Sequence, residues 1–429
     1  MKFNFSSFLL CASFCLSAFV ANAQINREAV VKRHNVKVNK VDSLSSLTVG
    51  NGNFAFTVDA TGMQSFPDAY IKGVPLGTQS VWGWHSFPNT GNYKVEEAQR
   101  TYELEGRMIS YTVQPKEPER KKQAVEYFRV NPHRLQLGNI GLEIKKKDGT
   151  LATVNDIQNI HQELNLWTGD IISNFTVEDV PVKVRTVAHQ QEDIVSFFIE
   201  SPLLTKKRIA IRIRFPYPNG QFKDVGDHFK SDEKHSSSLT STAGNALIKR
   251  TLDTTNYYVN INWSSSAAIK KNVDHYYILQ PAVSRKLFEC SFSFSEKKPV
   301  TTITNFFKTK QSSELAWKKF WQSGGAVDFS QVKEARAFEL ERRVVLSQYL
   351  TKVQCSAAYP PQETGLTYNS WYGKPHLEMH WWHAVHFAQW GRPELMEKSL
   401  DWYFTVAEKA KLIAKRQGFD GLRWQKMTD

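Results

Sequence analysis

Cysteine is scarce in this sequence, with four residues among 429. Cys11 and Cys15 lie in an N-terminal apolar stretch, so removal of that stretch would leave only Cys290 and Cys355. Nothing in their spacing requires a disulfide. Cys290 alternates with phenylalanines at 288, 292 and 294 along a predicted strand, which favours a buried free thiol over a bond to Cys355.

A membrane-spanning run is also lacking, because the apolar residues from Phe8 to Val20 are too few and have the wrong flanks. Lys2 precedes them, and Ala21-Asn22-Ala23 supplies a cleavage signal before Gln24. Neither early cysteine follows the small-residue pattern of a lipidated bacterial cysteine. We therefore predict a signal peptide over 1–23 and a released protein, periplasmic or extracellular.

Long runs of one charge are absent, although the formal net charge is +13. The basic runs are short, such as 120–122 and 145–147, and the other lysines are scattered. This distribution indicates a solvated surface and no nucleic-acid partner. We find no short internal repeat and no low-complexity linker.

Apolar residues recur at every second position between 24 and 298, which is typical of antiparallel strands. Phe54–Val58, the isoleucines at 209, 211 and 213, and the run 288–294 are examples. Turn clusters such as Gly50-Asn51-Gly52 separate these runs. The stretch 230–244, rich in Ser, Thr and Lys, is predicted to be an exposed loop. We predict a large antiparallel β-sandwich over 24–298. Further predicted strands are 108–113, 182–187, 194–199, 257–263 and 276–279.

After Pro299 the period changes to 3.6, which predicts helices. The first helix opens at Ser312 and is closed by Gly324-Gly325, with Trp317, Phe320 and Trp321 on its apolar side. The other predicted helices are 332–353, with Phe338, Val345 and Tyr349 near one face, 377–389, and Pro393 to about Arg416. We predict a helical linker over 299–353 and the beginning of an all-helical domain over 354–429.

The stretch 368–390 contains seven aromatic residues and four histidines. Histidines 376, 380, 383 and 386 have a spacing that could hold zinc. However, the order His-Leu-Glu-Met-His differs from His-Glu-x-x-His, and no cysteine or aspartate cluster completes a site. Hydrogen-bonded histidines among tryptophans are therefore the favoured interpretation, and we predict neither a metal nor a cofactor.

The same stretch has the side chains that a sugar-binding surface needs. Aromatic faces stack on the C–H groups of a sugar ring, and fixed polar groups bind its hydroxyls. The alternative is that tryptophans 381, 382 and 390 are helix core. Our candidate substrate-binding residues are Trp371, Tyr372, Lys374, Glu378, His380 and Trp381.

A pair of catalytic carboxylates, which glycoside hydrolysis generally requires, is not evident. The acidic residues after 360 are spread along predicted helices, where helix surface is the simpler interpretation. The catalytic residues are therefore expected beyond Asp429.

Three segments carry a resemblance to a known family. They are Leu-Thr-Val-Gly-Asn-Gly-Asn-Phe over 47–54, Gln-Glu-Leu-Asn-Leu-Trp-Thr-Gly over 162–169, and Gly-Lys-Pro-His-Leu-Glu-Met-His over 373–380. Together with the order of β-sandwich, helical linker and helical domain, they resemble glycoside hydrolase family 65 and related (α/α)6-barrel glycosidases. The resemblance implies an N-terminal fragment that ends inside an incomplete barrel, with the general acid farther along.

The resemblance further implies an inverting enzyme that acts on α-linked glucosides or related oligosaccharides. The family's tryptophan, aspartate and glutamate correspond to Leu377, Glu378 and His380, so the identity of the sugar is in doubt. Glu378 keeps the charge of the sugar-binding aspartate. Because phosphorylases act where sugar phosphates are kept, inside the cell, the predicted leader favours a hydrolase.

Two other hypotheses stay open. A polysaccharide lyase on the same plan would use Tyr368, His376 or His380 as base. A secreted, non-catalytic carbohydrate-binding protein would need no acid pair.

Overall fold

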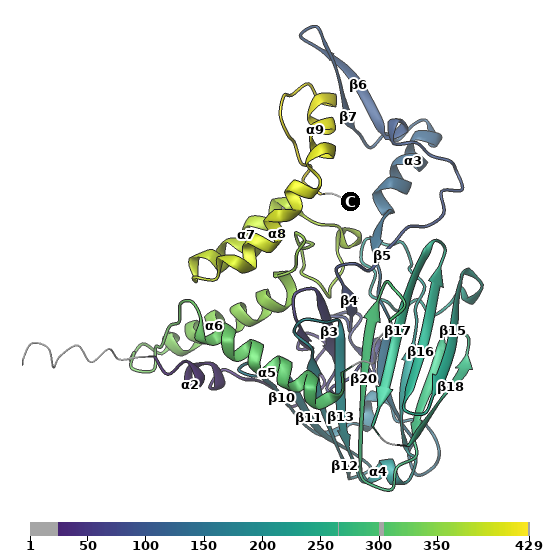
Figure 1. Ribbon diagram of the computed structural model, residues 1–429, viewed down its shortest axis with the longest axis vertical. Helices are drawn as coiled ribbons and strands as arrows, with labels where there is room; N and C mark the ends of the chain where they lie inside the picture. The colour runs from purple at the N-terminus through teal and green to yellow at the C-terminus, as the bar shows by residue number, and fades with distance from the viewer. Residues whose placement is uncertain (1–24, 265, 300–303, 428–429) are drawn as a thin grey trace, which may run out of the picture.

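The computed structural model describes residues 25–264, 266–299 and 304–427. The predicted leader at 1–23 lies outside this range. A large β region leads into helices (Figure 1), which is the predicted order of architecture. No helix of the described chain combines the length and apolar character needed to cross a membrane.

The largest sheet has nine antiparallel strands, and most of its neighbours are joined by hairpins. In spatial order they are β1 (Val36–Val38), β10 (Gln158–Asn165), β11 (Asp170–Val177), β12 (Val180–Ala188), β13 (Ile194–Glu200), β20 (Leu287–Ser295), β17 (Thr255–Trp263), β16 (Asn245–Leu252) and β15 (His235–Thr242).

Four smaller sheets complete the β region. A four-stranded sheet has the order β18 (Ala267–Val273), β19 (Tyr276–Pro281), β14 (Ile209–Arg214) and β9 (Asn139–Ile144). The others are β2 (Leu47–Gly50), β3 (Phe54–Val58) and β4 (Thr78–Ser80); β5 (Trp84–His85) and β8 (His133–Arg134); and β6 (Gln99–Leu104) and β7 (Arg107–Thr112).

One apolar core joins the nine-, four- and three-stranded sheets. The isoleucines of β14 and the phenylalanines of β20 are buried in it, as their period of two predicts. Arg212, on the opposite side of β14, is buried as well, because it donates hydrogen bonds to the carbonyls of Gln64 and Ser65 at 2.8 and 3.2 Å. Cys290 and Cys355 are free and buried. Burial raises the pKa of both thiols.

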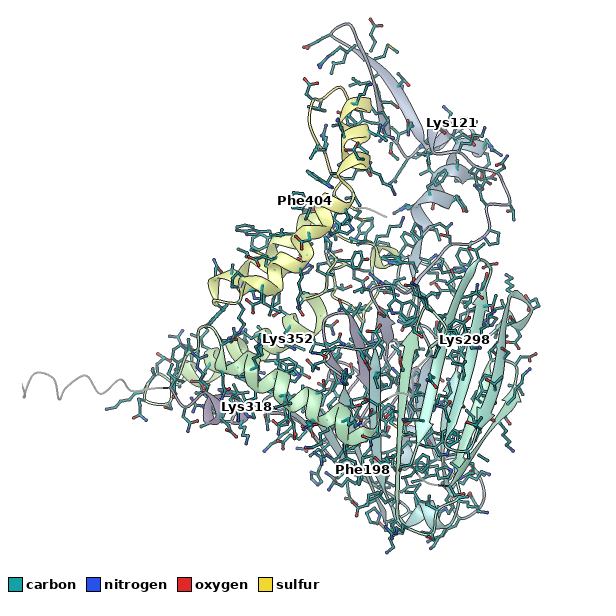
Figure 2. The ribbon with its side chains drawn as sticks, in the orientation of Figure 1. Lys121, Phe198, Lys298, Lys318, Lys352 and Phe404 are labelled. Carbon is teal, nitrogen blue, oxygen red and sulfur yellow. The ribbon has the colours of Figure 1, made fainter. Side chains whose placement is uncertain are left out.

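The helices that follow the β region lie on one side of it, except the last, which lies beside β7 (Figures 1 and 2). They are α5 (Phe306–Gln322), α6 (Arg336–Cys355), α7 (Leu377–Gln389), α8 (Pro393–Thr405) and α9 (Ala407–Arg416). Between the strands of the sequence lie α3 (Glu119–Val130) and α4 (Pro202–Thr205), and short 3-10 turns η1 (Pro67–Ala69), η2 (Val95–Ala98), η3 (Val154–Asp156) and η4 (Asp232–Lys234). Helix α2 (Arg27–Lys32) precedes the first strand and lies beside α5 and α6 (Figure 1).

The prediction of an exposed loop over 230–244 is wrong, because most of this stretch is the edge strand β15. Every residue from His235 to Thr242 pairs with β16. Strand β15 is at the edge of the sheet and most of its residues are exposed. Serine and threonine are therefore as common in it as in a loop. Helix α3 was not predicted either.

Three helix boundaries also differ from the prediction. Helix α5 begins at Phe306, because the side chain of Asn305 caps it by accepting a hydrogen bond from the Lys308 N–H at 3.0 Å. Helix α6 begins at Arg336. The single helix predicted from Pro393 is two, α8 and α9, because the chain leaves helical geometry at Val406. On α6, Val345 and Tyr349 are buried, but Phe338 is exposed.

Candidate functional site

The predicted site begins with a strained turn, η5 (Trp371–Gly373), between α6 and α7. Its three residues are left-handed in succession, with φ of 49°, 61° and 72°. Such a backbone costs a residue with a side chain on the order of 1–3 kcal/mol, so neighbouring groups must hold it. The Tyr372 N–H donates to the Phe222 carbonyl at 3.1 Å, and the Phe222 ring lies edge-on to Trp371. A Cβ at Gly373 would lie 2.3 Å from that of Arg134. Strain held this firmly is typical of binding regions.

Replacing Gly373 with alanine is therefore expected to lower the free energy of unfolding strongly. The matched control is Gly421→Ala, because Gly421 has a similar φ of 84° but no atom of the described chain within 4 Å of a Cβ. Both variants bear the left-handed penalty of about 1–2 kcal/mol. Overlap with Arg134 should add about 1–3 kcal/mol at Gly373 only. Urea unfolding measures the difference, and equal losses in the two variants would contradict the described turn.

Lys374 is buried and ties this turn to α3. Its ammonium donates to the carbonyls of Phe128 and Asn131 at 3.2 and 3.0 Å. These carbonyls lie at the C-terminal end of α3, where backbone oxygens lack helical partners and a cation is favourable. Among the six candidate residues, Trp371, Tyr372 and Lys374 thus pack against the β region.

His380 is a hydrogen-bonding group between α7 and α8. Its Nδ1 lies 3.0 Å from the hydroxyl of Tyr403, and its Nε2 lies 2.8 Å from that of Ser399. Burial lowers the pKa of His380 to about 4, so the ring is neutral near pH 7.

Glu378 and Trp381 point away from this interface. The Glu378 side chain is about half exposed and forms an ion pair with Lys426 at 2.5 Å, which lowers the pKa of its carboxyl. Trp381 is 65% exposed and Trp382 is 67% exposed. The six candidates therefore do not line one cavity together. A small cleft beside Arg134 is lined by only one of them, Tyr372.

Two histidines that sequence reasoning left outside the candidate site have free hydrogen-bonding capacity. His376 is 3% exposed, and neither of its ring nitrogens has a partner among the described residues. His383 Nε2 lies 3.1 Å from the carbonyl of Glu363, while its Nδ1 has no partner within the same range. Burial lowers the pKa of His383, and nearby His376 and His386 lower it further. Unsatisfied buried nitrogens are rare, and a sequence shows no sign of them.

A second cluster, distant in sequence, has the residue types of a metal site. Asp232, His235 and His275 offer ligand atoms within 4.8 Å of one another. However, Arg250 donates to Nδ1 of both histidines, at 2.5 and 2.9 Å. A neutral imidazole whose Nδ1 accepts carries its proton on Nε2, so it has no lone pair left for a cation. The geometry therefore describes a hydrogen-bond network around a buried arginine.

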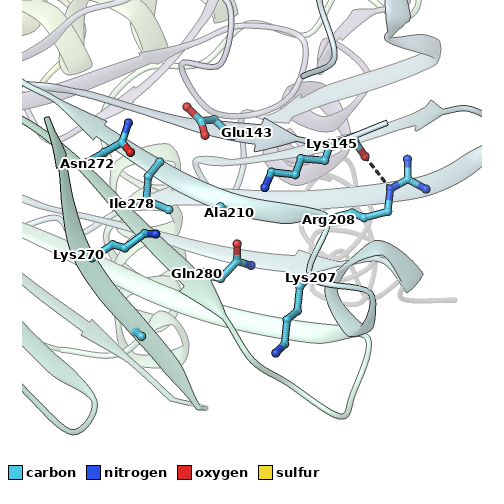
Figure 3. A pocket seen from close by; sticks show the side chains of 10 residues that line it. Glu143, Lys145, Lys207, Arg208, Ala210, Lys270, Asn272, Ile278 and Gln280 are labelled. Carbon is cyan, nitrogen blue, oxygen red and sulfur yellow. Dashed lines mark hydrogen bonds between the residues drawn. The ribbon is translucent and has the colours of Figure 1, made fainter. Parts of the chain in front are cut away.

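A hollow of about 380 Å³ lies on the outer face of the four-stranded sheet (Figure 3). Its cations include Lys145, Lys207, Arg208 and Lys270. Arg208 is already bound to the carbonyl of Lys145 at 2.6 Å and to the carboxylate of Glu178. The residues that line the hollow include no aromatic ring, so it lacks a stacking surface for a sugar.

Comparison with known proteins identifies the fold. No protein-family model matches the sequence, and no curated protein matches it. A solved structure from human microbiome, assigned as a kojibiose phosphorylase, matches 93% of this chain with a TM-score of 0.61 and 10% identity. A bacterial glucoamylase complexed with acarbose matches 88% with a TM-score of 0.45 and 8% identity. The chain covers 52% and 54% of these two chains, about half of their length. The first match shows a shared fold of a large β region followed by helices.

Proposed function

We propose that this chain is part of a carbohydrate-active enzyme related to glycoside hydrolase family 65 and the (α/α)6-barrel glycosidases. The observation that carries the proposal is the match of its architecture, over 93% of the chain, to a protein assigned as a kojibiose phosphorylase. A fold alone does not specify a reaction. The proposal therefore also rests on the chemistry of the stretch 368–390.

This stretch forms one wall of the proposed sugar pocket. Trp381 and Trp382 offer exposed aromatic faces for a sugar ring. Glu378 offers a carboxylate for hydroxyl groups. The imidazole nitrogens of His376 and His383 that have no partner in the described chain are buried, so these two residues are packing groups of the wall and do not contact the sugar. The anchored turn at Tyr372 would keep this wall fixed against the β region.

In this proposal, α7 to α9 begin a helical barrel that further helices complete. The chain covers about half of its structural neighbour, and large apolar side chains on these helices are exposed, as a surface awaiting partners would be. They include Trp381, Trp382, Leu400, Phe404 and Leu412. The acid and the base would come from the added residues.

The proposed reaction is hydrolysis of an α-linked glucoside or a related oligosaccharide with inversion. The predicted leader would place the protein outside the cytoplasm, where water is the available acceptor. In an inverting enzyme one carboxyl protonates the leaving oxygen and another activates water, and the two lie roughly 6.5–9.5 Å apart.

Glu378→Gln in the complete protein is expected to raise KM roughly tenfold with a smaller change in kcat, because a charged hydrogen bond to the sugar weakens. The matched control is Glu397→Gln, on the exposed surface of α8.

The stereochemistry of the reaction is a separate test. NMR of the sugar first released from an α-glucoside should show the β-anomer. An α-anomer would contradict inversion, and a KM change equal to that of the control would remove Glu378 from the proposed wall.

A further inference from the structure

A cavity of about 840 Å³ lies where the β12–β13 loop, α5, α6 and α8 meet. Its volume falls in the range of small-molecule sites, about 300–1,000 Å³. None of the six candidate sugar-binding residues lines it. Its lining is basic, with one carboxylate, Glu394, and four lysines: Lys308, Lys319, Lys352 and Lys398.

Among the described residues, these four lysines have no carboxylate partner. No ion pair formed within 25–264, 266–299 and 304–427 includes any of them. By contrast Lys310, also on α5, pairs with Glu314. Glu394 and Lys398 lie one helical turn apart, yet they form no pair. Four ammonium groups therefore surround this cavity with little compensating charge.

Lys352 is the most constrained of the four. It is 8% exposed, its ammonium donates to Gln190 Oε1 at 2.8 Å, and it lies 3.9 Å from the Trp317 ring centroid. Both neighbours are neutral, and burying an ammonium group without a counter-charge is costly. Burial, and to a lesser extent the nearby Lys398, lower the pKa of Lys352 to about 7. An anion in the cavity would supply the missing charge.

We propose that this cavity binds a small anionic molecule that carries a phosphate or a carboxylate group, with Lys352 and Lys398 holding the anion. The inference rests on the cavity and its unpaired lysines, and it is independent of the proposed glycosidase activity. The volume admits an acidic sugar or a sugar phosphate.

The test is thermal unfolding of the full chain with inorganic phosphate, with glucuronate, and with glucose as the neutral control, at constant ionic strength. We expect phosphate or glucuronate to raise Tm in a saturable manner, by roughly 2–4 °C near saturation. A response to phosphate alone supports a phosphorylated ligand, and a response to glucuronate alone supports a sugar acid. A saturable response to neither would overturn the proposal.

Lys398→Met and Lys352→Met should each abolish this rise in Tm. Lys398 is exposed, so its replacement should leave the fold intact. The matched control is Lys318→Met, on the exposed side of α5 and away from the cavity lining; Figure 2 labels both Lys318 and Lys352. An unchanged response in Lys352→Met and Lys398→Met would also overturn the proposal.

Proton uptake distinguishes binding by Lys352 from a purely structural role. The groups that line the cavity with Lys352 are Lys398 and Glu394 on α8, Lys308 and Lys319 on α5, and His189 in the β12–β13 loop. A bound anion favours the charged lysine and raises its pKa. At pH 8, calorimetry in two buffers of different ionisation enthalpy should therefore show uptake of up to about one proton per anion. Binding without proton uptake, or uptake that persists in Lys352→Met, would contradict the role of Lys352.

Discussion

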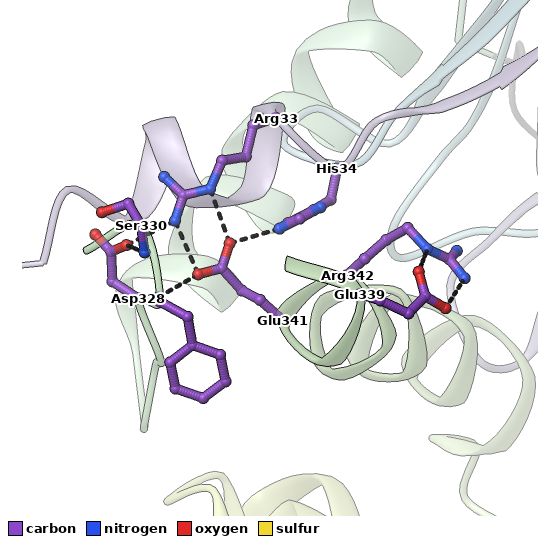
Figure 4. Close-up of polar contacts among 8 residues, drawn as sticks. Arg33, His34, Asp328, Ser330, Glu339, Glu341 and Arg342 are labelled. Atoms are coloured by element: carbon purple, nitrogen blue, oxygen red, sulfur yellow. Dashed lines mark hydrogen bonds and ion pairs between the residues drawn. The ribbon is translucent and has the colours of Figure 1, made fainter. Parts of the chain in front are cut away.

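Replacing Glu341 with alanine is expected to lower the free energy of unfolding by about 3–5 kcal/mol. Glu341 is 1% exposed and accepts two hydrogen bonds from Arg33, both at 2.8 Å, and lies 2.5 Å from Nε2 of His34. It also accepts the backbone N–H of Phe329 (Figure 4). Removing the carboxylate leaves the buried His34 ring and the Phe329 N–H without this acceptor, whereas the partly exposed Arg33 keeps its ion pair with Asp328. Glu341 thus links α6 to the residues that follow α2, beside the ring contact of His34 with Phe338.

A matched control lies two residues away on the same helix. Glu339 pairs with Arg342 and Arg343 on the surface of α6. An exposed pair contributes about 0–1 kcal/mol, so Glu339→Ala should be nearly neutral. Urea unfolding of both variants measures the contrast, and Glu341→Gln should lie between them because it keeps some hydrogen bonds. Equal losses at 339 and 341 would contradict the proposed role of Glu341.

Replacing Arg392 with alanine is also expected to lower the free energy of unfolding by about 3–5 kcal/mol. Arg392 is 2% exposed and donates to the carbonyls of Phe320 and Ser323, the latter at 2.7 Å, and to Gln348 Oε1 at 2.9 Å. Helix α5 ends at Gln322, so Arg392 binds the carbonyls of its C-terminal end, where the Phe320 carbonyl also accepts the Ser323 N–H and the Ser323 carbonyl accepts a hydrogen bond from Arg27. The guanidinium also lies 4.2 Å from the Phe320 ring centroid. One arginine thus attaches the start of α8 to both α5 and α6.

Arg336→Ala is the control for this prediction, because Arg336 is 88% exposed and pairs only with Glu334 in the described chain. We expect a loss below about 1 kcal/mol there. Arg392→Lys should fall between, because lysine keeps the charge but loses the planar fork. If Arg392→Ala unfolds at the same urea concentration as Arg336→Ala, the attachment of α8 does not depend on this residue.

Much of the β region is predictable because its signal is local. The isoleucines of β14 and the phenylalanines of β20 alternate within a few residues, and alternation reports one buried face. Edge strand β15 was missed for a physical reason: Leu239 is its only apolar residue, so neither face of the strand shows apolar alternation. The sequence around Val406 has no glycine or proline to mark the end of α8, so the helical periodicity predicted one continuous helix there.

The candidate site stays a prediction. Sequence reasoning selected the stretch 368–390, but the direction of each side chain in it depends on partners that are far away along the chain. Lys374 is held by carbonyls more than 240 residues earlier. His380 is held by α8, and Gly373 is required by Arg134. No local pattern contains these contacts.

The measurement that tests the central claim most directly is sugar release by the complete protein from α-linked disaccharides, with and without inorganic phosphate. We predict release of free sugar in phosphate-free buffer, at a rate that phosphate does not change. Strict dependence on phosphate, with a sugar phosphate as product, would contradict the hydrolase. Binding of the same sugars without any release would contradict the enzyme altogether.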